Sequence, residues 1–163
     1  MADRDYFLKI DGIEGESQDS KHKGEIQLDS FSWEANNDGT FSSNKGGGSG
    51  KVAMRDFKFT MDVNKSSPKL ILACATGQHI KSAVLTCRKA GKGQQDYLTY
   101  TLSDVLVSYY RTATPPEGNG VIPRDEVGLN FAKIEVEYKE QNADGTLGGA
   151  VKVGYDLKQT AEV

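Results

Sequence analysis

At 163 residues the chain is long enough for one hydrophobic core and short for two, so we expect a single domain over residues 1–163. A hydrophobic content of 37% and a charged content of 26% are typical of a globular protein and argue against a disordered or membrane-inserted chain. The net charge of −3 argues against nucleic acid as the principal partner, because that binding needs a concentrated basic surface.

Segments that alternate apolar and polar residues at period two fill most of the chain, separated by breaks rich in glycine, proline or asparagine. This pattern predicts a mainly β protein. The expected strands are, in chain order, Tyr6–Asp11, Glu25–Glu34, Val52–Val63, Ser82–Lys89, Tyr97–Thr101, Val105–Tyr110, Glu126–Lys139 and Val151–Leu157. Three connections, Glu14–Gly24, Ala35–Lys51 and Thr112–Asp125, are longer than usual, and we expect partners to bind there.

Two of the expected strands change phase part-way along. The apolar residues move from even to odd positions at Asp29–Ser30, and from odd to even positions at Ala132–Lys133. Because a one-residue slip would expose half of each apolar set, we expect a β-bulge near each of these pairs. Bulges bend long strands, so the pattern favours a curved, barrel-like sheet over a flat one.

The stretch NKGGGSGKV, Asn44–Val52, places a Gly-Lys pair behind a run of glycines and raises the question of a phosphate-binding loop. Such a loop has the pattern G-x-x-x-x-G-K-[ST] and leads into a helix. Here Lys45 stands in the place of the first glycine, Val52 in the place of the hydroxyl residue, and an expected strand follows. We therefore expect no nucleotide site, and interpret the stretch as part of a long extended loop at about residues 35–51.

One short helix is predicted at about residues 67–76, in the segment SSPKLILACATG. Ser67 can cap it, Pro68 suits the first turn, and Gly77 supplies a left-handed terminator. The residues expected to face the sheet are Leu70, Ile71 and Cys74.

The residues indicate no catalytic or metal-binding site. His22 and His79 have no neighbouring Cys or His and lie in no nucleophile motif, so we expect both to be structural or solvated. The spacing of Cys74 and Cys87 is unlike that of a zinc site, and both resemble small buried hydrophobic residues. We expect neither an enzyme nor a bound cofactor.

Two other functions stay open at this stage. The first is a monomeric β-barrel module that binds oligosaccharide or single-stranded nucleic acid by stacking on Tyr97, Tyr100, Tyr109 and Tyr110. No basic stripe accompanies these tyrosines, which favours a packing role. The second is a hydrolase that pairs His79 with a carboxylate.

Several segments between Tyr6 and about Leu157 together resemble one known family. They are FSWE, GKVAMRDFKFT, SSPKLILACATGQH, LTCRKAG, DYLTYTLSDVLVS and LNFAKIEVEY, of which the helix segment and RKAG are the most specific. The chain resembles the haemolysin-coregulated protein (Hcp) family, the tube proteins of type VI secretion systems. The resemblance implies a compact β-barrel of two curved antiparallel sheets, with the short helix at its flank and the long loop extended.

The resemblance also implies a structural function. Six-subunit rings of the protein stack into a tube, capped by a valine-glycine-repeat spike protein, enclosed by a contractile sheath and joined to a baseplate. Contraction drives the tube from the bacterial cytoplasm out of the cell or into a target cell, with effectors carried in the lumen. The N-terminus MADRDYFLKIDG lacks the regions of a cleaved signal peptide, which agrees with that route. Neither nucleic acid nor membrane insertion is implied.

Two groups of residues follow from the resemblance. In this family the loop between the second and third strands extends towards the adjacent ring, and it matches Asn36–Gly50 here. The residues expected to stack rings are Asn36, Asn37, Lys45, Gly46, Gly47, Gly48 and Gly50. Ser30 and Ser32, polar positions on the preceding strand, are candidates to face the lumen and contact effectors, and a solvated strand face is the alternative.

Overall fold

The computed structural model describes residues 4–39, 51–89, 93–116 and 121–163. Its elements are β1 (Arg4–Ile10), β2 (Ile26–Leu28), β3 (Ser30–Ser32), β4 (Ala35–Asn37), β5 (Val52–Met54), β6 (Phe57–Asp62), α1 (Ser67–Thr76), β7 (Ile80–Lys89), β8 (Asp96–Ala113), β9 (Arg124–Gln141), β10 (Leu147–Asp156) and β11 (Ala161–Glu162). The prediction of a mainly β chain with one short helix is confirmed for these residues.

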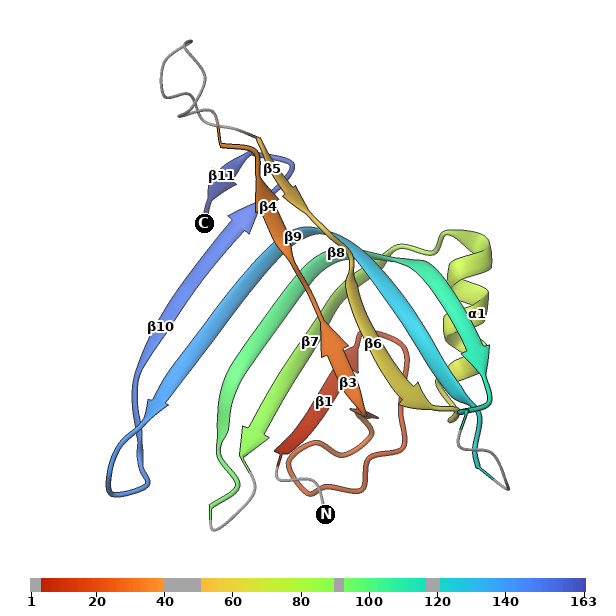
Figure 1. Cartoon of the computed structure of the whole chain (residues 1–163), viewed down its shortest axis with the longest axis horizontal. Helices are drawn as coiled ribbons and strands as arrows, with labels where there is room; N and C mark the ends of the chain where they lie inside the picture. The colour runs from red at the N-terminus through yellow and green to blue at the C-terminus, as the bar shows by residue number, and fades with distance from the viewer. Residues whose placement is uncertain (1–3, 40–50, 90–92, 117–120) are drawn as a thin grey trace.

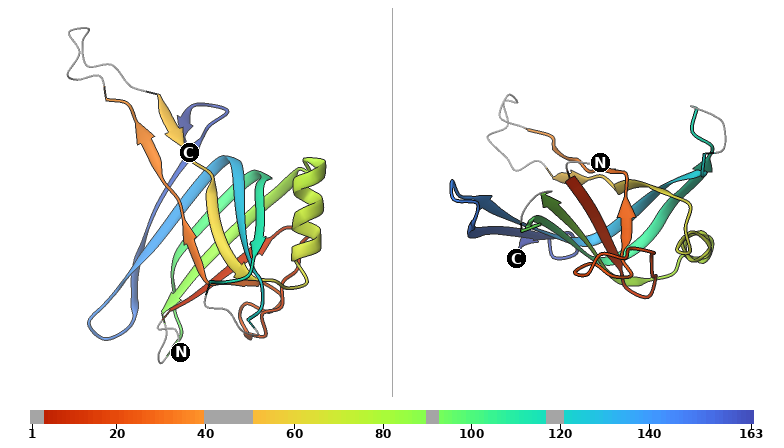
Figure 2. Two further views of the ribbon diagram at one scale, coloured as in Figure 1. Left: turned by 45° about the vertical axis from the view of Figure 1, so that its right-hand side comes forward. Right: turned by 90° about the horizontal axis from the view of Figure 1, so that it is seen from below.

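Most strands belong to one strongly curved antiparallel sheet. Its order is β11-β10-β9-β8-β7-β1-β2, with β6 also paired to β9 and β3 paired to β6. Between β2 and β3, the Asp29 N–H donates to the Thr60 carbonyl at 2.9 Å, so the sheet curls back almost onto itself (Figure 1). The body is barrel-like as predicted. The second sheet is only the β4–β5 hairpin, which projects from this body (Figure 2).

Strands β7, β8 and β9 change phase together at one level of the sheet. Two buried rows mark the change: Ile80, Val105 and Phe131 in one, and Ala83, Leu102 and Ile134 in the next. Neighbouring strands keep their register across this level, where Asp104 has a positive φ of 53°. The bulge predicted near Ala132–Lys133 is therefore wrong in position, since the β8–β9 register shifts between Val107 and Tyr109.

The register shift depends on a glycine in the facing strand. A Cβ atom on Gly128 would lie 3.0 Å from the Tyr109 Cβ and 3.2 Å from the Ser108 Oγ. A larger residue at position 128 would therefore crowd the bulge, so the glycine permits the close approach of β8 and β9.

The core fills the inside of the curl. Phe57, Phe59 and Met61 alternate along β6 and are almost completely buried, and α1 contributes Leu70 and Ala73. The expectation that Ile71 faces the sheet is wrong, because this residue follows Leu70 by about 100° around the helix and is half exposed. Cys74 is partly buried against the core.

The start of α1 differs from the prediction and its end agrees with it. The N-cap is Ser66, whose side chain makes no capping hydrogen bond. Ser67 instead donates its hydroxyl to buried Asp125 at 2.7 Å and accepts the Asn64 N–H at 3.1 Å. Gly77 adopts the predicted left-handed conformation, with φ 65°. No helix in the described part of the chain is long and apolar enough to cross a membrane.

Candidate functional site

The second half of β9 and the strand β10 form an arm that extends beyond the barrel-like body (Figure 1). Val153 pairs with Val136, and Val151 with Tyr138, so by alternation they share the face on which Ile134 is buried. Towards the end of the arm this face is uncovered, because Val151 is 67% exposed, Val153 60% and Tyr138 44%. We call these three residues the arm strip. Contiguous exposed apolar side chains of this kind indicate an interaction surface.

The opposite face of the arm is polar and internally paired. The Lys133 and Lys152 ammonium groups each lie 3.1 Å from a carboxylate oxygen of Glu135, and these lysines lower the pKa of Glu135. The Lys139 ammonium lies 3.7 Å from Glu137. A carboxyl group with a lowered pKa stays ionised at neutral pH, so Glu135 is suited to the solvated, cross-paired face and not to general acid catalysis.

The β4–β5 hairpin carries the described part of the predicted stacking loop. Asn36 and Asn37 lie on β4, exposed, and pair with Ala53 and Val52 of β5. The base of the hairpin is held by Trp33, whose indole N–H donates to a backbone carbonyl of the returning chain at 3.0 Å. The predicted stacking residues outside the described ranges are Lys45, Gly46, Gly47, Gly48 and Gly50. Most of the glycine-rich stretch Asn44–Val52 also lies outside those ranges.

The predicted lumen residues Ser30 and Ser32 both lie exposed on β3, while Phe31 between them packs inward on Tyr6 and Phe57. The Ser30 and Thr60 hydroxyl oxygens are 2.6 Å apart. Ser32 lines a surface groove together with Trp33, Met54 and Lys58. The two serines therefore share one outward face of the strand, beside the base of the hairpin.

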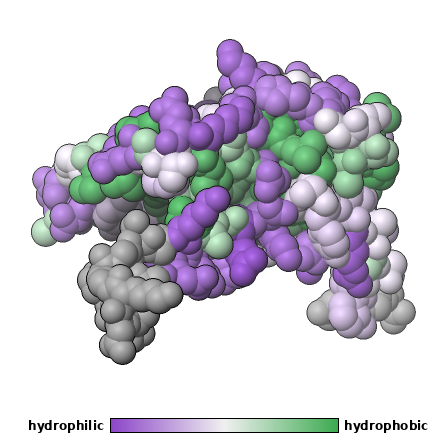
Figure 3. Space-filling model, turned by 90° about the horizontal axis from the view of Figure 1, so that it is seen from above, coloured by the Kyte–Doolittle hydropathy of each residue, from purple (hydrophilic) through white to green (hydrophobic). Residues whose placement is uncertain are grey.

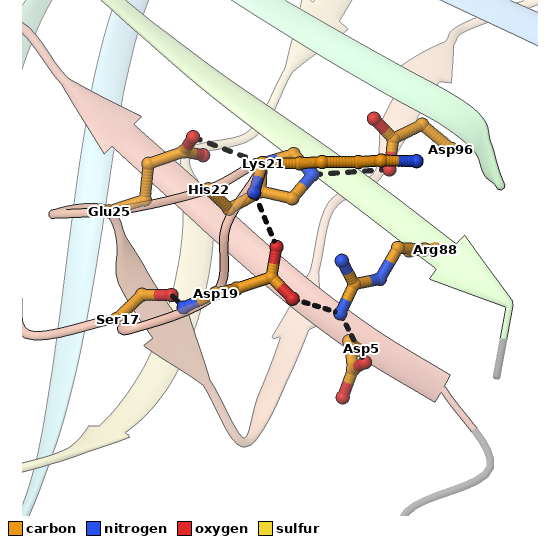
Figure 4. A network of polar contacts seen from close by, with 8 residues as sticks. All are labelled: Asp5, Ser17, Asp19, Lys21, His22, Glu25, Arg88 and Asp96. Carbon is orange, nitrogen blue, oxygen red and sulfur yellow. Dashed lines mark hydrogen bonds and ion pairs between the residues drawn. The ribbon is translucent and has the colours of Figure 1, made fainter. Parts of the chain in front are cut away.

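A buried arginine holds the long loop that precedes β2 (Figure 4). Arg88 is 3% exposed, and its Nη2 lies 3.0 Å from a carboxylate oxygen of Asp5 and 2.8 Å from one of Asp19. The hydrogen bond from Arg88 lowers the pKa of Asp19 to about 2. No local pattern in the sequence indicates this role of Arg88, because its partners come from β1 and from the loop. The loop at residues 14–24 is thus fastened to its own subunit.

His22 completes this network, and the expectation that it is structural is confirmed. Its ring is stacked on Phe7, with Nδ1 3.0 Å from Glu25 and Nε2 3.2 Å from Asp96. The ring is buried. Both ring nitrogens lie within hydrogen-bond distance of a carboxylate, so contacts on two sides hold the ring in place.

His79 does meet a carboxylate, as the hydrolase alternative requires. Its Nε2 lies 2.9 Å from Asp104, whose other oxygen is 3.2 Å from the Lys158 ammonium. Hydrogen bonds from His79 and Lys158 lower the pKa of Asp104. Both the histidine and the aspartate are exposed, and His79 has no further hydrogen-bond partner among the described residues. Within the same part of the chain, no three His, Cys, Asp or Glu residues are grouped to hold a metal.

The four tyrosines considered for stacking do not form one platform. Tyr97, Tyr100 and Tyr110 pack against the core. Burial and the neighbouring Asp125 carboxylate raise the pKa of Tyr110 to about 12. Tyr109 is the most exposed of the four, and the Lys58 ammonium lies over its ring, 5.9 Å from the ring centroid.

Comparisons with known proteins agree with one another. A family model described as "Type VI secretion system effector, Hcp" matches residues 7–138. Protein hcp1 of Pseudomonas aeruginosa is 42% identical over 162 residues, covering 97% of this chain and 98% of the relative. The crystal structure of Hcp1 from Salmonella typhimurium is similar with 33% identity, 99% and 100% coverage and a TM-score of 0.81. A solved structure described as a type six secretion system protein matches with 27% identity, 98% and 99% coverage and a TM-score of 0.91.

Proposed function

The chain belongs to the Hcp family of type VI secretion tube proteins, and we propose that it forms homohexameric rings that stack into the inner tube of such a system. The observation that carries the proposal is the arm strip, an apolar face that continues the core beyond the body and lies uncovered in a single subunit. Covering it in an assembly removes apolar surface from water, the main driving force of protein association. Glu135 and its lysines keep the other face of the arm compatible with solvent.

The tube proposal assigns roles to the hairpin and to β3. The β4–β5 hairpin, with Asn36 and Asn37 exposed, projects from the body in both views, which suits a contact with the next ring (Figure 2). Ser30 and Ser32 present small polar groups that suit a water-filled lumen and contacts with secreted effectors. The remaining partners are the valine-glycine-repeat spike protein, the contractile sheath and the baseplate. The bacterial cytoplasm is the proposed site of assembly, before export without a cleaved signal peptide.

Imaging and secretion provide the test. Native mass spectrometry and negative-stain microscopy of the purified protein are expected to show hexameric rings. A monomer at every concentration and salt tried would contradict the tube proposal and favour the monomeric binding module. Secretion is expected to cease in cells that lack the contractile sheath, and His79→Ala is expected to leave both ring assembly and secretion unchanged. Loss of secretion with rings intact in that variant would favour the hydrolase.

A further inference from the structure

The outer side of α1 is a second uncovered apolar surface. Leu70 and Ala73 turn inward, whereas Leu72 is 59% exposed and Ile71 48%. Lys69 lies on the same side as Leu72, because residues three apart are neighbours on a helix surface. We call Lys69, Ile71 and Leu72 the helix patch. The helix and the arm lie on opposite flanks of the molecule (Figure 1), and hydrophobic surface is visible on both sides, interrupted by polar surface (Figure 3).

The two flanks carry opposite charge. From Val63 to Lys89 the sequence contains no Asp or Glu, and Lys69 and Lys81 are exposed cations in that segment. On the arm and the following turn, every lysine is already paired within the subunit, with Glu135, Glu137 or Asp104. The acidic residues there that have no Lys or Arg partner among the described residues are Glu140, Asp144, Asp156 and Glu162. The helix flank is therefore basic, and the arm presents unpaired acids.

We propose that the arm strip of one subunit packs on the helix patch of the next, with Lys69 facing the unpaired acids of the arm. This inference rests on the proposed ring and names its interface. A closed ring needs two different patches on each subunit, placed so that one subunit's patch meets its neighbour's other patch. The arm strip and the helix patch satisfy that condition in apolar character, in opposite charge and in their positions on opposite flanks.

Two charged substitutions test the interface from its two sides. Val153→Asp disables the arm strip and Leu72→Asp the helix patch, and both sites are exposed enough to keep the subunit folded, which circular dichroism checks. Each variant alone is expected to be monomeric at concentrations where the unmodified protein forms rings. Ile122→Asp, at an exposed apolar residue outside both patches, is the matched control and is expected to keep the ring. If Val153→Asp alters the fold, Val151→Asp replaces it.

Mixing the two variants gives the sharpest result. The intact arm of Leu72→Asp can meet the intact helix of Val153→Asp, but the resulting pair has no functional patch left. The mixture is therefore expected to yield one-to-one heterodimers and no rings by native mass spectrometry. Rings from either variant alone, or a mixture that stays monomeric while the unmodified protein forms rings, would overturn this interface and leave the tube proposal standing. Absence of rings from the unmodified protein would instead contradict the tube proposal itself.

The charge arrangement has its own readout. Lys69→Glu is expected to raise the protein concentration needed for ring assembly about tenfold, because losing one favourable charge contact of about 1.4 kcal/mol changes the association constant by that factor. Raising the salt concentration is expected to weaken ring assembly of the unmodified protein, because salt screens exposed charges. The concentrations at which the unmodified protein and Lys69→Glu assemble should then become more similar. Equal assembly of both proteins at low salt would exclude Lys69 from the interface.

Discussion

The imidazole of His22 lies parallel to the ring of Phe7, with the ring centroids 4.4 Å apart and 7° between the planes. Phe7 alternates with Tyr6 and Leu8, which face the main core, so it points to the other face of β1. It is nevertheless only 1% exposed. The loop before β2 therefore buries Phe7 on the face of β1 opposite the main core, and the His22 ring is the part of the loop that packs on it.

We expect His22→Ala to lower the free energy of unfolding by about 1–3 kcal/mol, because it removes the stacked ring and two hydrogen bonds to carboxylates. Urea denaturation measures this loss, and trypsin cleavage at Lys23 reports whether the loop has detached. Lys21→Ala is the matched control, since the contact of this neighbouring residue with Asp19 uses its backbone N–H and remains. Equal stability of the two variants would show that the loop does not depend on the stack.

Arg88→Met is expected to cost about 3–5 kcal/mol, because it leaves Asp5 and Asp19 close together without their buried cation. Removing the charges of all three groups tests the cause. The triple variant Arg88→Met, Asp5→Asn, Asp19→Asn is expected to recover most of the loss, since a neutral cluster avoids the cost of desolvating ions. Thermal unfolding of the two variants measures the difference, and equal melting temperatures would contradict this explanation.

Asp19→Asn is expected to change the acid dependence of stability. Arg88 lowers the pKa of Asp19 from 3.8 in the unfolded chain to about 2 in the folded protein. The ion pair therefore stabilises the protein at pH values above 3.8, and this stabilisation is lost as the pH falls from 3.8 towards 2. At neutral pH the variant should be less stable by about 1 kcal/mol after solvent screening. Near pH 2 the two proteins should unfold alike. A constant difference across this range, measured by urea denaturation, would exclude the ionisation of Asp19 as the cause.

Asp125→Asn is expected to lower the pKa of Tyr110, which burial and the Asp125 carboxylate raise to about 12. A raised pKa keeps the proton in the folded state, so the stability linked to Tyr110 is present below its ordinary value near 10 and is lost as pH rises towards 12. Ultraviolet titration follows the tyrosines, and Tyr110→Phe identifies the transition. The same high-pH transition in Asp125→Asn would show that burial alone sets this pKa.

Local signals in the sequence predicted the parts of the fold that local physics determines. Alternation located the long strands, and Gly77 marked the end of α1, because these signals act within a few residues. The strand predicted in two pieces, Tyr97–Thr101 and Val105–Tyr110, is one continuous β8. The alternation stops at the level of Asp104, but the neighbouring strands change phase at the same level and so the ladder continues.

The contacts missed from the sequence join residues far apart in the chain. Ser67 has the sequence position of a helix cap, but its hydroxyl donates a hydrogen bond to Asp125, which lies 58 positions later in the chain. Arg88 and Asp19 meet only once β7 lies beside β1 and the loop has folded over them. The arm strip was also missed, because Val151 and Val153 have the alternation of a buried strand and only the folded topology shows that their side chains are exposed.

Shortening the connection between β4 and β5 by deleting Lys45–Gly50 is expected to weaken the stacking of rings while leaving the subunit and single rings intact. Loops on the surface of a domain tolerate deletion without loss of the fold, and the strands β4 and β5 that flank this connection project from the body (Figure 2). Circular dichroism and native mass spectrometry should match the unmodified protein, whereas tubes in negative stain should be shorter or absent. Unchanged tube lengths would assign ring stacking to another surface. Loss of the β-sheet signal in circular dichroism would instead show that the loop is needed for folding of the subunit.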